Sequence, residues 1–182
     1  MMHGTEKASA WVERWTHLLP PNSRVLDIAC GAGRHMRWLA SQGHRVQGVD
    51  RNPEAVTLAQ AFGPVTCADI ENGPWPFEGM TFDGVIVTHY LWRPLLPQIL
   101  QCVAPGGLLI YETFASGQAL IGKPSRADFL LQPGELLDAT KGLRTIAYED
   151  GFELSPDRFV QRIAAVREVA SSAFERWHLR AI

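Results

Sequence analysis

A glycine-rich segment and a carboxylate stand at a spacing that could bind a nucleoside. Gly31 and Gly33 come directly after the mostly apolar segment 24–28, and Asp50 follows a second such segment at 45–49. Glycine permits a tight turn and lets backbone N–H groups approach a ligand closely. A carboxylate at the end of the second strand of a doubly wound sheet is placed to bind ribose hydroxyls. We therefore predict a site for a nucleoside-containing ligand.

The residues around the turn bear on the kind of nucleoside. A dinucleotide site needs a third small residue, in the pattern G-x-G-x-x-G/A, so that the helix can approach the pyrophosphate closely. Met36, which is bulky, occupies that position. Asp27, just before the turn, could instead meet an ammonium group. The pattern favours a ligand that carries an amino acid and leaves a nicotinamide-dependent oxidoreductase as an alternative.

Short apolar segments alternate with helical patterns along the chain, which is typical of a parallel sheet wrapped by helices. We predict strands at 24–28, 45–49, 65–68, 82–87 and 108–111. Helices are predicted at about 6–19, after Gly33, from residue 53 with Asn52 as the cap, near 94–103, and from about 133 to 142. Segments 145–148 and 162–169 are expected to form an antiparallel hairpin at one edge of the sheet. One domain over residues 1–182 accounts for the pattern.

Five segments resemble the motifs of class I S-adenosylmethionine-dependent methyltransferases. Residues 25–33 (VLDIACGAG) resemble the first motif, and residues 48–53 (GVDRNP) resemble the motif of the second strand. Residues 68–71 (ADIE) are similar to the acidic loop after the third strand, 82–85 (FDGV) to the fourth strand, and 100–107 (LQCVAPGG) to the turn before the fifth. They follow the family's order. The chain length and the sequence GAGRH also resemble small, tellurite-resistance-type members.

This resemblance implies a fold, a cofactor and a set of binding residues. The fold is a Rossmann-like doubly wound α/β sheet of seven mostly parallel strands, with helices on both faces and one antiparallel strand, 162–169, between 108–111 and 145–148. The cofactor is S-adenosylmethionine. By position, its methionine half is assigned Asp27, Ala29, Gly31 and Gly33, its ribose and adenine Asp50 and Arg51, its adenine ring Asp69 and Ile70, and its junction with the methyl acceptor Thr88. For Asp69, a role within a turn or helix cap is the alternative.

The residues after the fourth strand are candidates for the acceptor side. His89 could act as a general base, because the unperturbed pKa of histidine lies near neutrality, or it could form part of the pocket wall. Tyr90 is a second catalytic candidate, although it and Trp92 are more typical of a pocket wall. Glu112 and Phe114 could border the acceptor, and for Glu112 a solvent-facing charge at the strand end is the alternative.

Other segments offer further contacts with an acceptor. Lys123 and Arg126 beside Phe129 could form a lid that favours an anion, or residues 129–131 could tuck into the core below a solvated loop. Trp75 either covers adenine or packs beneath its loop. Arg162 and Arg167 are expected as exposed charges on an edge strand. An aromatic pocket for a small molecule is expected from Trp15, His89, Tyr90, Trp92, Phe114 and Phe129.

Composition narrows the function. A formal net charge of −2 and the lack of a basic cluster count against nucleic-acid binding. The sequence shows no apolar segment of membrane-spanning length, no secretory signal and no metal-binding spacing, so we expect a cytoplasmic location and no metal. It predicts no oligomeric state. The prediction is an enzyme that moves the methyl group of S-adenosylmethionine to a small molecule. The alternatives are a non-catalytic, methyltransferase-like cofactor-binding module that acts through a partner, and the oxidoreductase.

Overall fold

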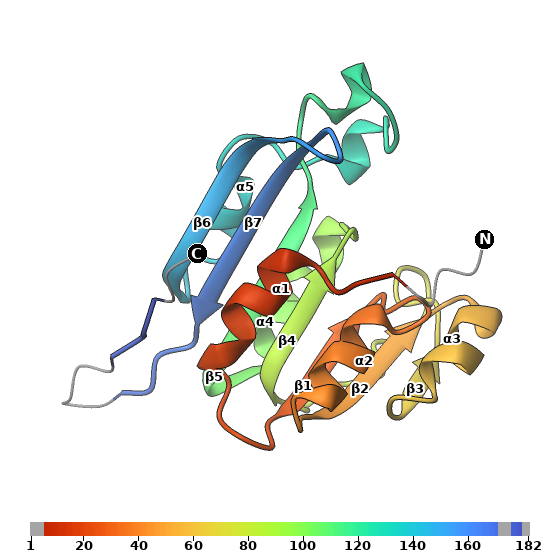
Figure 1. Ribbon diagram of the computed structural model, residues 1–182, viewed down its shortest axis with the longest axis vertical. Helices are drawn as coiled ribbons and strands as arrows, with labels where there is room; N and C mark the ends of the chain where they lie inside the picture. The colour runs from red at the N-terminus through yellow and green to blue at the C-terminus, as the bar shows by residue number, and fades with distance from the viewer. Residues whose placement is uncertain (1–5, 171–175, 180–182) are drawn as a thin grey trace.

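A seven-stranded sheet forms the centre of the computed structural model, which describes residues 6–170 and 176–179 (Figure 1). The order across the sheet is β3-β2-β1-β4-β5-β7-β6. The strands are β1 (Arg24–Ile28), β2 (Arg45–Asp50), β3 (Val65–Cys67), β4 (Phe82–Thr88), β5 (Val103–Phe114), β6 (Arg144–Glu153) and β7 (Arg158–Val166). Only β7 is antiparallel to its neighbours, β5 and β6. The predicted sheet, with its inserted antiparallel strand, is confirmed.

Helices cover both faces of this sheet. They are α1 (Ala10–Trp15), α2 (Arg34–Ser41), α3 (Pro53–Ala59), α4 (Leu96–Gln101) and α5 (Glu135–Ala139). Trp11 of α1, Met36 of α2 and Ala59 of α3 share one buried cluster, whereas Ile99 of α4 and Leu136 of α5 belong to the cluster on the opposite face. Figure 1 accordingly shows α1 and α2 in front of the sheet and α4 behind it. None of the helices in the described ranges is both long and apolar enough to cross a membrane.

The helix starts near the glycine turn follow from local chemistry. Asn52 accepts hydrogen bonds from the N–H groups of Glu54 and Ala55, and Pro53 takes the first turn of α3, as predicted. Gly33 precedes α2 with a φ of 81°, and a Cβ there would lie 3.0 Å from the backbone of Ala59. Glycine at this position therefore serves both the turn and the close approach of α3.

Most elements differ in their bounds from the prediction. Strand β7 begins four residues earlier than the predicted 162–169 and ends before residue 167, β6 extends past 145–148 on both sides, and α4 and α5 are shorter than 94–103 and 133–142.

Two further differences bear on the site. The first helix is limited to α1 and a 3₁₀ turn at Thr16–Leu18, because Ser9 caps α1 by accepting a hydrogen bond from the N–H of Trp11. Strand β5 is longer than expected at both ends. Its pairing with β7 extends as far as Phe114, so Glu112 lies inside the strand and not at its end.

The interpretation of Arg162 and Arg167 as exposed edge charges is wrong. Strand β7 lies between β5 and β6, so it is not an edge strand. The Arg162 guanidinium pairs with Glu112 and Glu149, while Arg167 donates hydrogen bonds to the carbonyls of Val103 and Leu100. The charged residues that alternate with apolar residues in β7 therefore have partners within the protein.

Candidate functional site

A cavity of about 120 Å³ lies where β1, β2 and β3 end at their carboxyl termini. Such ends are where doubly wound sheets bind ligands. Five of the residues predicted to bind the cofactor line it, namely Ala29, Asp50, Arg51, Asp69 and Ile70. The structure therefore brings these separate segments together. A larger cavity of about 780 Å³ runs along α1 between α2 and β6 and is lined by none of the predicted site residues.

The glycine turn and Asp50 form one hydrogen-bonded unit. Ala29 and Gly31 both have left-handed backbones, with φ of 53° and 54°. One carboxylate oxygen of Asp50 accepts a hydrogen bond from Gly31 N–H at 2.8 Å, and the other accepts one from Asn52 N–H at 2.9 Å. Each oxygen keeps a second lone pair for a ligand hydroxyl. Asp50 thus both fixes the turn and faces the cavity.

Two observations show that the turn suits a ligand. Among the described residues other than Gly31 and its two chain neighbours, no heavy atom lies within 4 Å of the position that a Cβ on Gly31 would take, so the backbone here borders open space. Asp27 is 1% exposed, and its Oδ2 has no hydrogen-bond partner among the described residues. Burial raises the pKa of this carboxyl group to about 8, although Arg34 opposes the shift. A buried acceptor without a partner is matched by the ammonium group of an amino acid.

Asp69 lines the cavity as predicted and also has the turn role, whereas Tyr90 lies away from the acceptor side where it was predicted. Asp69 accepts hydrogen bonds from the backbone of Glu71 and Asn72 and from the Asn72 side chain, so the turn role is present. These bonds lower the pKa of Asp69. Tyr90 lines the same cavity as Asp69, on the predicted nucleoside side. Burial, and then Glu71, raise the pKa of Tyr90, so the phenol keeps its proton at neutral pH.

His35, which the sequence analysis did not select, connects Thr88 to the segment before α1. It is 1% exposed, and its Nε2 accepts a hydrogen bond from Ser9 N–H at 3.2 Å. Nδ1 therefore carries the ring proton and faces Thr88 Oγ1 at 3.4 Å. Burial lowers the pKa of His35 to about 3. A single histidine within a helix gives no sequence signal for such a contact.

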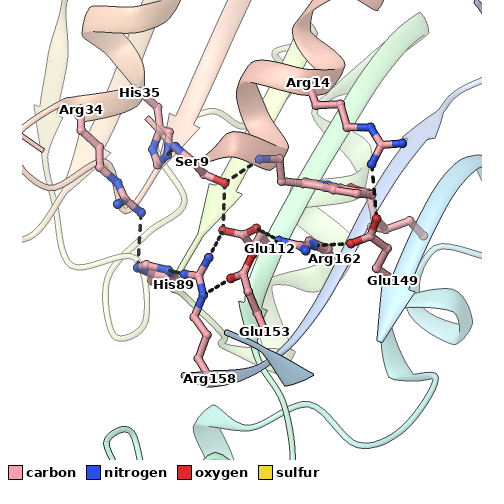
Figure 2. A network of polar contacts seen from close by, with 12 residues as sticks. Ser9, Arg14, Arg34, His35, His89, Glu112, Glu149, Glu153, Arg158 and Arg162 are labelled. Atoms are coloured by element: carbon pink, nitrogen blue, oxygen red, sulfur yellow. Dashed lines mark hydrogen bonds and ion pairs between the residues drawn. The ribbon is translucent and has the colours of Figure 1, made fainter. Parts of the chain in front are cut away.

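A buried ionic network centres on Glu112, which is 0% exposed (Figure 2). Ser9 donates its hydroxyl hydrogen to one carboxylate oxygen at 2.9 Å, and Arg162 donates to the other at 3.2 Å. Arg162 also contacts Glu149 and Glu153. The alternative of a solvent-facing Glu112 is wrong, because its side chain is surrounded by Ser9, before α1, and by Arg158 and Arg162 of β7.

His89 lies between two guanidinium groups. Its Nδ1 is 3.3 Å from Arg34 Nη2, its Nε2 is 3.0 Å from Arg158 Nη1, and its ring stacks on Phe114 with centroids 5.0 Å apart. Although the residue is exposed as a whole, burial of the ring and the charge of Arg34 lower the pKa of His89 to about 4. Taking up a proton between two cations is unfavourable. The geometry therefore disfavours the general-base role.

The expected aromatic pocket is formed only in part by the described residues. His89 and Phe114 meet, but Trp15 is 1% exposed and packs in the core beneath α1, so its predicted place in the pocket is wrong. Trp92 packs against the core on the opposite face, as does Trp75, whose edge-to-face contact with Phe77 matches the packing alternative.

In the segment proposed as an anion lid, Arg126 is paired within its own loop. It pairs with Asp128 and lies over the Phe129 ring, and both charged side chains are exposed. Leu130 and Leu131 are buried, which confirms the alternative of a loop that tucks into the core for these two residues, whereas Phe129 is half-buried.

Comparisons with known proteins agree with this geometry. A family model described as "Methyltransferase domain" matches residues 25–107, a range that includes every predicted cofactor residue. Thiopurine S-methyltransferase of Xanthomonas axonopodis pv. citri (strain 306) is 50% identical over 56 residues, which are 30% of this chain and 26% of that protein. The tRNA U34 carboxymethyltransferase of Shewanella sp. (strain W3-18-1) is 34% identical over 134 residues, 62% of this chain and 40% of that protein. The chain thus spans well under half the length of these relatives.

The fold itself is shared with solved structures. TehB from Haemophilus influenzae superposes with a TM-score of 0.75 at 17% identity, covering 91% of this chain and 64% of that one. The order of the strands, the glycine turn with Asp50 and the matched domain model agree with one another. Residues 25–107 match the methyltransferase domain, and the fold around them is the Rossmann-like fold that the resemblance to class I S-adenosylmethionine-dependent methyltransferases implies.

Proposed function

We propose that the chain binds S-adenosylmethionine at the carboxyl ends of β1, β2 and β4 and transfers its methyl group to a small molecule. The observation that carries this proposal is the buried Oδ2 of Asp27, which has no hydrogen-bond partner among the described residues, on the strand that leads into the open turn at Gly31. A ligand with an ammonium group completes this site, and the cofactor of the family has one. The oxidoreductase alternative lacks such an observation.

Each side chain has a role that its surroundings support. Asp27 binds the ammonium group, and Asp50 accepts hydrogen bonds from the ribose hydroxyls while it holds the glycine turn. Ile70 and Tyr90 border the nucleoside cavity, with Ile70 supplying an apolar wall. When bound, the cofactor would supply a methyl group bonded to a positively charged sulfur, and that sulfur would leave as an acceptor nucleophile attacks the methyl carbon in line.

The described residues then act mainly by positioning. Thr88 Oγ1 accepts a hydrogen bond from His35 Nδ1–H, so the hydroxyl hydrogen of Thr88 is free to be donated to a ligand. Ser9 and His35 hold the segment before α1 against the strand ends, which helps to exclude water. Because the leaving sulfur already carries charge, orientation and desolvation supply much of the acceleration. No general base is required of His89.

A small molecule is the acceptor that we favour. The net charge of −2 provides no surplus of cations for phosphates. Among the relatives, the name thiopurine S-methyltransferase points to a small acceptor, whereas the tRNA U34 carboxymethyltransferase is named for an RNA. The ring pair of His89 and Phe114 offers a surface on the scale of a small ring.

Two measurements test the proposal. Calorimetric titration with S-adenosylmethionine, S-adenosylhomocysteine and NAD should show binding of the first two and none of NAD. Methyl transfer from isotope-labelled cofactor should then appear on members of a panel of small thiols, amines and carboxylic acids, and not on bulk tRNA or rRNA. Failure of both sulfur ligands to bind would overturn the cofactor assignment, and labelling of RNA alone would overturn the acceptor class.

A further inference from the structure

Hydrogen-bond donors outnumber acceptors where Arg34, His89 and Arg158 meet (Figure 2). Each guanidinium group only donates, and one faces each ring nitrogen of His89. A neutral imidazole has one N–H and one acceptor nitrogen. In one of these two contacts, therefore, an N–H of His89 faces an N–H of an arginine. The low pKa of His89 is consistent with this crowding of donors. The cluster is satisfied only when further acceptor atoms are supplied.

Carboxylates hold the two arginines from behind and do not supply those atoms. Glu153 pairs with Arg158 Nε at 2.5 Å, and Glu112 lies 3.8 Å from Nη2, so Nη1 is left toward His89. Glu6 lies 3.6 Å from Arg34 Nη1, while Nη2 is turned to His89. The cluster therefore offers a ligand directed N–H donors and not a surplus of positive charge. Arg158, whose side chain is 17% exposed, has little freedom to turn away.

The cluster lies between the glycine turn and the strands on the acceptor side. Arg34 directly follows Gly33, and His89 directly follows β4. Because β7 is antiparallel to β5, Arg158 at the start of β7 lies at the same end of the sheet as the carboxyl end of β5, where Phe114 stacks on His89. His89 has a φ of 53°, a conformation that costs energy for a residue other than glycine and often marks a functional position.

We infer that Arg34, His89 and Arg158 form a subsite for a carboxylate group. Two oxygens with about four lone pairs match the converging N–H groups and relieve the opposed donors. The inference rests on the proposed function, in which two molecules could bring the carboxylate: the methionine end of the cofactor or the methyl acceptor. The place of Arg158 on β7, beyond β5 from the glycine turn, favours the acceptor. The Phe114 ring then suits an aromatic body, as in benzoate.

The first arm of the test asks whether the cofactor's carboxylate occupies the subsite. S-adenosylhomocysteine and 5′-methylthioadenosine, which lacks the amino acid, are titrated calorimetrically into the parent protein and the R34Q and R158Q variants. Arg144 pairs with an exposed Glu168 at the other end of the β6–β7 hairpin from Arg158, so R144Q is the matched control. If the cofactor fills the subsite, both variants lose about tenfold or more for S-adenosylhomocysteine and keep their affinity for 5′-methylthioadenosine.

The second arm asks whether an acceptor carboxylate occupies it. Benzoate and the uncharged benzamide are titrated into protein saturated with S-adenosylhomocysteine and, separately, into protein without it. We expect saturable binding of benzoate in the millimolar range, weak binding of benzamide, and a loss of about tenfold or more for benzoate in R158Q but not in R144Q. His89→Phe, which keeps the stacking ring and removes its nitrogens, should weaken benzoate less than R158Q does.

The outcomes separate the possible conclusions. Loss of benzoate in the arginine variants, with unchanged S-adenosylhomocysteine, supports an acceptor subsite, and the reverse pattern supports the cofactor. The subsite is refuted if both ligands bind the parent, R34Q and R158Q alike, or if benzoate and benzamide bind equally and the nucleoside arm shows no change. Failure of both nucleosides to bind the parent refutes the proposed function, while benzoate binding without cofactor still tests the subsite. Circular dichroism and thermal unfolding confirm that each variant is folded.

Discussion

Replacing Asp27 by asparagine removes the charge of a buried carboxyl group and keeps its shape. The pKa of about 8 means that most ligand-free protein carries a protonated Asp27 at neutral pH. An ammonium group binds the ionised form best, so binding has to release this proton. S-adenosylhomocysteine affinity should therefore depend on pH in the parent and not in Asp27→Asn.

The size of the effect follows from the pKa. Ionising a group of pKa about 8 costs about 1.4 kcal/mol at pH 7 and about 2.7 kcal/mol at pH 6. The dissociation constant should thus improve about ninefold from pH 6 to pH 7 and about fivefold from pH 7 to pH 8. Folding stability has a linked slope. The native state binds the Asp27 proton more tightly than the unfolded chain, whose pKa is near 3.8, so the free energy of unfolding falls as pH rises between these values.

Calorimetry at several pH values, repeated in buffers of different ionisation enthalpy, measures both affinity and proton release. 5′-Methylthioadenosine is the control, because it lacks the ammonium group and should bind with little dependence on pH. Asp27→Asn should show a flat profile, weaker binding of S-adenosylhomocysteine at pH 8, and higher stability than the parent at the alkaline end. An equal pH profile in the parent and in Asp27→Asn would refute the pairing of Asp27 with the ammonium group.

Three further predictions address other parts of the site and its support. Asp50→Asn keeps one acceptor for the glycine turn but loses the charge, so S-adenosylhomocysteine should bind about 10- to 100-fold more weakly in calorimetry; unchanged affinity would contradict the ribose role. His89→Gln should lower kcat less than tenfold, whereas a loss of about 100-fold or more in steady-state assays would restore the general base. Arg93 forks onto Glu135 and also donates to the carbonyls of Asp128 and Leu130, so Arg93→Lys should lower the free energy of unfolding by about 1–3 kcal/mol in denaturant titrations; no change would show that this fork is dispensable.

The strand–helix order and the cofactor turn could be predicted because their causes are local. Asn52 and Pro53 start α3 by neighbouring contacts, and Gly31 and Gly33 are glycines because their own backbones are left-handed. Asp50 contacts the glycine turn from a neighbouring strand, and the parallel pairing of β1 with β2 brings the ends of these two strands together. Pattern and periodicity are sufficient for such features.

The acceptor side could not be predicted because its partners are far apart in the sequence. Glu112 appeared to end a strand, since its enclosure depends on how far β5 pairs with β7. The contact between His89 and Arg158 joins residues 69 positions apart. Trp15 has the residue type of a pocket wall, yet the face of α1 that it occupies turns toward the core. Tertiary packing decides each of these cases.

A row of polar residues across β4, β5, β7 and β6 also determines the register of the last two strands. Thr88, Glu112, Arg162 and Glu149 lie side by side on four neighbouring strands. A shift of β7 by one residue would set Glu112 opposite Gln161 or Ile163, and a shift by two would set it opposite an apolar residue. Leaving a buried charge unpaired costs roughly 3–5 kcal/mol, so the misaligned sheets are strongly disfavoured. The hairpin of β6 and β7, whose partner Glu112 lies 50 positions before Arg162, therefore has one strongly favoured alignment against β5.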